Sequence, residues 1–221
     1  MKRVRRKWMW TVCLGILVLF LAYQSVKAGN ARGKIDYKKN LDEVCVTVDG
    51  KKLTFRDLAF YVAYEELTIQ EQALVYDADN TNKYWNLHIN GEFVRVAARD
   101  SAIQMAIHDQ IFYEMAMEEG VSLTEEDKQA LEDKQIDFWE DLTEDDGQER
   151  IGVSKEEIET AMEKIAYAEK YQGIYAELHG KEYDDYSFSA EVYEEFLEDH
   201  SYKIVSDWKR VDMGNVSICH Y

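Results

Sequence analysis

The chain has 221 residues with 44 acidic and 26 basic side chains, a net charge of −18 at pH 7. So acidic a chain repels nucleic acid and anionic lipid, and it favours cationic or unfolded polypeptide partners. The 46% hydrophobic content excludes wholesale disorder, and the complete absence of proline fits a mainly helical fold of one or two domains.

The first 28 residues differ from the rest in charge, because they hold six basic side chains and no acidic one. Five of the six precede the apolar run Trp8–Tyr23, and this order sends the following chain across a membrane. We therefore predict that residues 1–28 are a cytoplasmic basic tip with a signal-anchor helix, or alternatively a signal peptide cleaved near Ala28. The body is then extracytoplasmic, either anchored in the cell membrane or secreted.

A polar linker, residues 29–41, precedes the predicted folded body. Val44, Val46 and Val48 alternate along the chain with the period of a half-buried strand. Asp49-Gly50 then predicts a two-residue hairpin turn and a return strand. Thr54, with Asp57 three residues later, has the spacing of a capping box and predicts a helix that ends near Tyr76.

The segment from Asp77 to His88 partly follows a calcium-binding loop pattern. However, position six is Asn82 instead of glycine and position twelve is His88 instead of glutamate. We interpret this segment as an exposed turn that caps the next helix, and we assign no metal site to it.

Three long amphipathic helices are predicted in the middle of the chain. The first follows the turn-forming Asn90-Gly91, runs from Glu92 with an apolar side chain on most turns, and stops at Gly120. Ser122 and Thr124 both offer an N-cap for the second, which ends within Thr143–Gln148. A capping box at Ser154 opens the third, which stops at Gly180.

The last part of the chain is predicted to be less regular. A short helix follows Ser189, and the apolar stretches Tyr202–Val205 and Trp208–Val211 are expected to be extended. Residues 206–221 are accordingly taken as an extended C-terminal tail.

The order of these segments resembles a known family. The hairpin motif VCVTVDGKKLTFRDLAFYV, the helix end MAMEEGVSLTEED and the closing segment SAEVYEEFLEDHSYKIV are similar to the N-terminal chaperone domain of the SurA and PrsA foldases. The resemblance implies a mainly α fold over residues 42–205, with a small β-hairpin at its start. The parvulin isomerase domain of that family needs about 90–100 residues, whereas sixteen residues follow Val205. No isomerase site is therefore assigned.

The resemblance implies an extracytoplasmic, membrane-tethered holdase or foldase that binds unfolded, partly folded or secreted polypeptides. Two alternatives stay open: an envelope scaffold with one dedicated partner, and a protein related to the peptidyl-prolyl isomerases. Homodimerisation also stays open. The sequence has no catalytic, cofactor or metal motif, so we expect no enzymatic centre.

Methionine and aromatic side chains on the helix that starts at Glu92 are the candidate polypeptide-binding residues, because such side chains suit adaptable surfaces. They are Met105, Phe112, Tyr113, Met115 and Met117. The alternative is that each belongs to the core. Cys45 and Cys219, near the first and last predicted strands, are either a disulfide or two free thiols.

Overall fold

The structure is a computed structural model that describes residues 33–220. The predicted anchor, residues 1–28, and the start of the linker lie outside the described residues. Ile35–Tyr221 forms one compact unit. Within residues 33–220, no helix is both long enough and apolar enough to cross a membrane.

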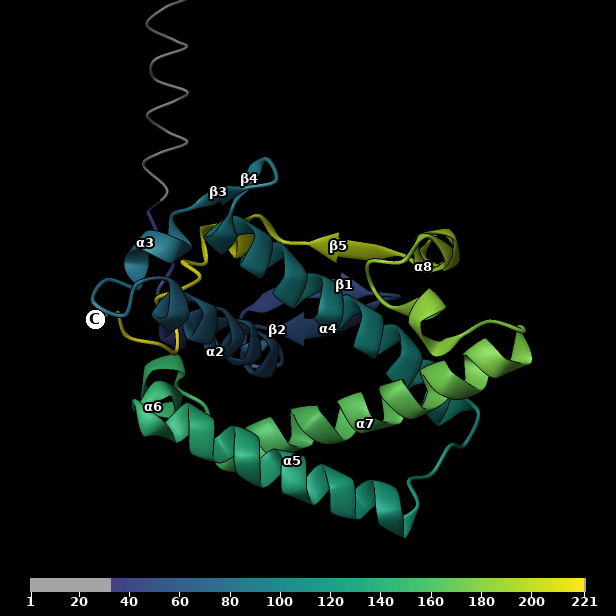
Figure 1. The fold of residues 1–221 in the computed structure, drawn as a ribbon. Coiled ribbons are helices and arrows are strands. Elements are labelled where there is room, and N and C mark those ends of the chain that lie inside the picture. The colour runs from purple at the N-terminus through teal and green to yellow at the C-terminus, as the bar shows by residue number, and fades with distance from the viewer. Residues whose placement is uncertain (1–32, 221) are drawn as a thin grey trace, which may run out of the picture. The chain divides into compact units, whose positions relative to one another are not determined.

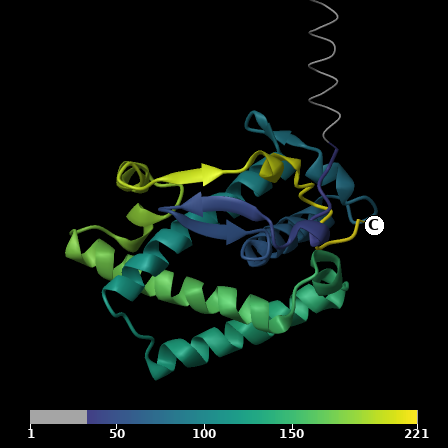
Figure 2. The ribbon, with the colours of Figure 1, turned by 180° about the vertical axis from the view of Figure 1, so that it is seen from behind.

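Helices make up most of the described chain, as predicted (Figure 1). Four of them are long: α2 (Ala59–Tyr76), α4 (Val94–Glu118), α5 (Glu125–Glu144) and α7 (Lys155–Leu178). The short ones are η1 (Lys38–Asn40), α3 (Asn82–Trp85), α6 (Gly147–Ile151), η2 (Tyr183–Tyr186), α8 (Glu191–Leu197) and η3 (Ser206–Arg210). In both views α5 is the long helix farthest from the sheet, with α7 between them (Figures 1 and 2).

The predicted hairpin is the start of a three-stranded antiparallel sheet with the order β2-β1-β5. β1 (Val44–Val48) and β2 (Lys51–Thr54) are joined by Asp49 and Gly50, which have φ values of 46° and 82°. Positive φ at both central residues is what a type I′ turn requires. The third strand, β5 (Tyr202–Ile204), pairs with β1 so that Val46 lies opposite Ile204 (Figure 2). The sequence predicted an extended segment there but not its partner.

Helix starts follow the predicted capping residues with two corrections. The Ser154 capping box forms as predicted, and of the two N-caps offered for α5 the structure uses Thr124, which also forms a capping box with Asp127. The Thr54 N–H also donates to Asp57 Oδ2 over 2.7 Å, yet turns follow and α2 begins only at Ala59. Similarly, α4 begins at Val94, because a small hairpin of β3 (His88–Ile89) and β4 (Glu92–Phe93) uses the Asn90-Gly91 turn first.

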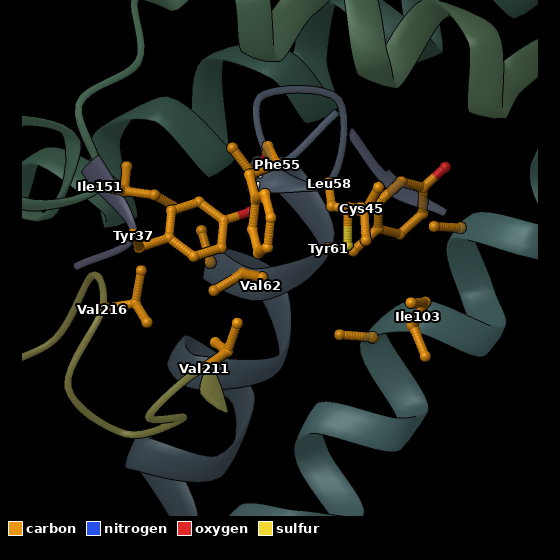
Figure 3. Close-up of a cluster of buried hydrophobic side chains, with 14 of the residues drawn as sticks. Tyr37, Cys45, Phe55, Leu58, Tyr61, Val62, Ile103, Ile151, Val211 and Val216 are labelled. Atoms are coloured by element: carbon orange, nitrogen blue, oxygen red, sulfur yellow. Dashed lines mark hydrogen bonds between the residues drawn. The ribbon is translucent and has the colours of Figure 1, made fainter. Parts of the chain in front are cut away.

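The main core lies where the sheet, α2, α4 and the end of the chain meet (Figure 3). Cys45 from β1 and Val62 from α2 are fully buried there. The Tyr37 hydroxyl donates to the Phe55 carbonyl over 2.5 Å, and the two rings pack edge to face. Val216, from the end of the chain, lies in the same cluster (Figure 3).

The expectation of an extended tail from residue 206 is wrong over Ser206–Arg210, which forms the 3-10 helix η3. Backbone N–H groups there close turns, as in the bonds from Trp208 N–H to Val205 O over 3.2 Å and from Val211 N–H to Trp208 O over 3.0 Å. Trp208 is 1% exposed, and six of the twelve described residues after it are buried as well. The C-terminal segment is therefore part of the core.

A buried carboxylate fixes this segment to α2. Glu66 is fully buried, and its Oε1 accepts the backbone N–H groups of Gly214, Asn215 and Val216 over 2.6–3.1 Å. Its Oε2 accepts the N–H and the hydroxyl of Ser217 over 2.5 and 2.6 Å. Burial raises the pKa of the Glu66 carboxyl, and these hydrogen bonds oppose that shift. The cage of five donors holds residues 214–217 in one conformation.

Candidate functional site

A groove of about 900 Å³ lies between α2, α4, α5, α7 and the segment that follows η2. It is larger than a second pocket, of about 240 Å³, that lies between β2, α2, α4 and α7. Its main apolar and aromatic lining residues are Phe60, Tyr64, Met105, Leu131, Phe138, Met162, Ile165 and Phe188. The volume lies in the range of binding pockets for small molecules and peptide side chains.

The groove is bordered by α5, the least buried of the four long helices, whose Leu131, Phe138 and Trp139 pack against the main core only in part. Of its 20 residues only Leu142, near its C-terminal end, is buried. At the other end Asp127 accepts a hydrogen bond from Lys170 of α7, and in the middle Gln135 Nε2 donates to the Glu159 carbonyl over 3.0 Å. A helix attached at a few points along its length leaves its apolar face only partly covered.

Aromatic rings form one wall of the groove. The rings of Phe60 on α2 and Phe138 on α5 have centroids 4.8 Å apart, and Tyr64 stacks on Phe60 at 5.9 Å. Tyr64 is 44% exposed and Phe138 is half-buried. These rings therefore present both edges and faces to whatever enters the groove.

A buried histidine fixes the segment at the end of the groove. His108 lies with Nδ1 2.7 Å from Asp109 Oδ1 and Nε2 2.9 Å from the Tyr186 carbonyl oxygen. A backbone carbonyl can only accept, so His108 Nε2 donates to Tyr186 and ties η2 to α4. The Asp109 carboxylate also hydrogen bonds Tyr61, whose pKa burial raises.

The charges along the groove are mostly acidic. Lys170 donates to Asp127 and holds the pKa of that carboxyl at about 2. Lys134 lies 3.6 Å from Glu169. These are the lysines that line the groove. Asp137 and Asp141 also line it, and neither has a cationic side chain within ion-pair distance among residues 33–220.

The structure separates the five candidate residues on α4. Met105 lines the groove. Phe112 is fully buried in a second cluster with η2 and α8, and Met115 is half-buried against the core. Tyr113 lines a smaller pocket of about 240 Å³, and Met117 is 39% exposed near the end of the helix. The five residues therefore lie in different surroundings and do not form one binding surface, although all of them are on α4.

Sequence reasoning missed most of the groove, although one signal for it was visible. Leu131 and Phe138 belong to the apolar stripe that predicted the second long helix. The stripe indicates a helix with an apolar face, but it does not indicate whether another element covers that face. Phe60, Tyr64 and Phe188 carry no local signal that distinguishes them from core residues.

Neither the calcium-like loop nor the cysteines add a site. Residues 82–85 of the loop form α3, and Asp77 pairs with Lys83 over 2.5 Å. Among residues 33–220, no group of three or more His, Cys, Asp and Glu side chains is placed to hold a metal ion. Cys45 and Cys219 are both free thiols, so the disulfide that we considered does not form.

Comparisons with protein families, with characterised proteins and with solved structures find no match for this chain.

Proposed function

We propose that this protein is a chaperone-like polypeptide-binding protein, tethered to the membrane outside the cytoplasm, and that the groove beside α5 binds segments of unfolded or partly folded chains. The observation that carries the proposal is the open groove of about 900 Å³ with aromatic and aliphatic walls in a strongly acidic chain. An exposed apolar surface of this kind in an otherwise charged protein marks an interaction site.

The physical properties of the groove suit transient binding. Aromatic, methionine and branched aliphatic side chains contact many different apolar residues without a fixed hydrogen-bond pattern. An extended segment or one face of an amphipathic helix is the kind of occupant that an apolar groove takes. The surrounding charge keeps a complex with an unfolded chain soluble.

Two further observations support the finer parts of the proposal. The hairpin, the long helices and the returning segment Ser189–Val205 have the order that resembles the chaperone domain of the SurA and PrsA foldases. The basic tip and apolar run of residues 1–28 support the membrane tether and the extracytoplasmic side. No isomerase activity is proposed.

The test uses the chain from Gly29, because Ile35–Tyr221 is a compact unit with its own core. We expect this protein to suppress aggregation of a denatured client at near-stoichiometric ratio. Phe138→Ser removes a groove ring and weakens suppression, whereas Ile136→Ser, on the same helix but outside the groove lining and 42% exposed, leaves it unchanged.

Aggregation that proceeds as if the protein were absent would contradict the proposal. If crosslinking in the native membrane then yields one dominant partner, the scaffold alternative is the better account.

A further inference from the structure

We propose that the groove selects polypeptide segments in which apolar side chains are flanked by lysine or arginine, and that Asp137 and Asp141 of α5 bind those cations. This inference rests on the proposed function and adds the class of client. It follows from two observations: two of the carboxylates that line the groove have no cationic partner within the described part of the chain, and aromatic rings lie beside them.

The charged side chains of the groove do not balance. Asp109 is paired with His108 and Asp127 with Lys170, while Glu169 lies near Lys134. Asp137 and Asp141 are the lining carboxylates without such a partner within the described part of the chain. A negative charge remains on the α5 side of the groove, and a bound segment meets it.

The two carboxylates are placed to act on one segment. Residues four apart on a helix lie on the same face, about 5–6 Å from each other. Both are exposed, and Phe138, which lies between them in the sequence, touches the Phe60 ring and lines the same groove. A lysine or arginine can therefore lay its aliphatic stem on the rings with its charge at a carboxylate.

The aromatic wall favours the same occupant. A cation within about 6 Å of an aromatic ring face gains about 0.5–1 kcal/mol at an exposed site, which corresponds to about a twofold to fivefold gain in affinity. Tyr64, stacked on Phe60 and 44% exposed, offers such a face beside the apolar floor. The groove can thus bind the apolar side chains of a client segment and, at the same time, a lysine or arginine of that segment beside Asp137 and Asp141.

Other occupants fit less well. A second copy of this chain carries a net charge of −18, so its surface repels the acidic rim. An anionic lipid surface is repelled in the same way. A neutral apolar segment binds the walls but gains nothing from Asp137 and Asp141.

The experiment measures binding of three labelled peptides to the chain from Gly29 by fluorescence anisotropy. The peptides share one set of leucine and phenylalanine residues and differ at the flanking positions, which are lysine, glutamine or glutamate. We expect the lysine peptide to bind most tightly and the glutamate peptide most weakly. The preference for lysine should shrink at high ionic strength, because salt screens exposed charges.

Two double variants locate the effect. Asp137→Asn with Asp141→Asn should weaken the lysine peptide about threefold to tenfold, since each exposed ion pair contributes roughly 0.2–1 kcal/mol, and should leave the glutamine peptide unchanged. Glu132→Gln with Glu140→Gln changes the net charge equally on the same helix but outside the groove lining, and should have no effect.

The outcomes separate this inference from the proposed function. If no peptide binds, the groove is not a polypeptide site and both fail. If all three peptides bind equally, the proposed function stands and the cation preference is wrong. If both double variants weaken the lysine peptide alike, the preference comes from overall charge and not from Asp137 and Asp141.

Discussion

The carboxylate of Glu66 gives the sharpest test of how this fold is held together. Glu66→Gln keeps the shape of the side chain but replaces one oxygen by an NH₂ group. The natural carboxylate accepts five hydrogen bonds, four of them from backbone N–H groups of residues 214–217. In the variant, the amide NH₂ must face either the Ser217 donors or the three N–H groups at Oε1.

The cost can be estimated from those contacts. With the NH₂ toward Ser217, the hydroxyl can rotate to accept, but the Ser217 N–H loses its partner in a buried place. Leaving one buried donor unsatisfied and making three charged hydrogen bonds neutral costs about 2–5 kcal/mol. The free energy of unfolding of a whole domain is about 5–15 kcal/mol, so the variant loses a large part of its stability. Ser217→Ala removes only the hydroxyl and should cost about 1 kcal/mol.

Chemical denaturation followed by circular dichroism measures these differences on the chain from Gly29. Glu71→Gln is the control, because Glu71 lies on the same helix as Glu66 and is exposed. If Glu66→Gln unfolds at the same denaturant concentration as the natural sequence, apolar packing alone holds the C-terminal segment and the donor cage is not a stabilising feature.

Two further predictions concern the packing of this segment and the attachment of α5. Gly214 has φ +88°, and a Cβ there would lie 2.7 Å from the Trp85 ring, so Gly214→Ala should destabilise the fold by about 1–3 kcal/mol in thermal unfolding; an unchanged melting temperature would contradict the close approach. The pKa of Asp127 is lowered to about 2 by Lys170, so the pair stabilises the fold above the ordinary carboxyl value and this contribution is lost as pH falls from about 4 to 2. The difference in unfolding free energy between the natural protein and Lys170→Gln should therefore narrow across that window, and a constant difference would refute the assignment.

The sequence by itself determined the features that depend on neighbours a few residues apart. The Asp49-Gly50 turn, the capping boxes at Thr124 and Ser154 and the glycine that ends α4 all follow from interactions within about four residues. Such interactions are the same wherever the segment lies in the fold. The sequence therefore predicted the β1–β2 turn, the starts of α5 and α7 and the end of α4 correctly. The predicted start of α2, just after Thr54, was wrong because the residues after Thr54 form turns and the helix begins at Ala59.

Only the tertiary structure decided which helix faces are covered by neighbouring elements and which segments distant in the sequence contact each other. β5 pairs with β1 across more than 150 residues, and Glu66 meets a segment almost as distant in the chain. An apolar stripe on α5 looks the same in sequence whether a neighbour buries it or leaves a groove beside it, because periodicity records the side chains of one helix and not the position of the next. The groove, on which the proposed function rests, depends on the positions of neighbouring helices and therefore could not be predicted from the sequence.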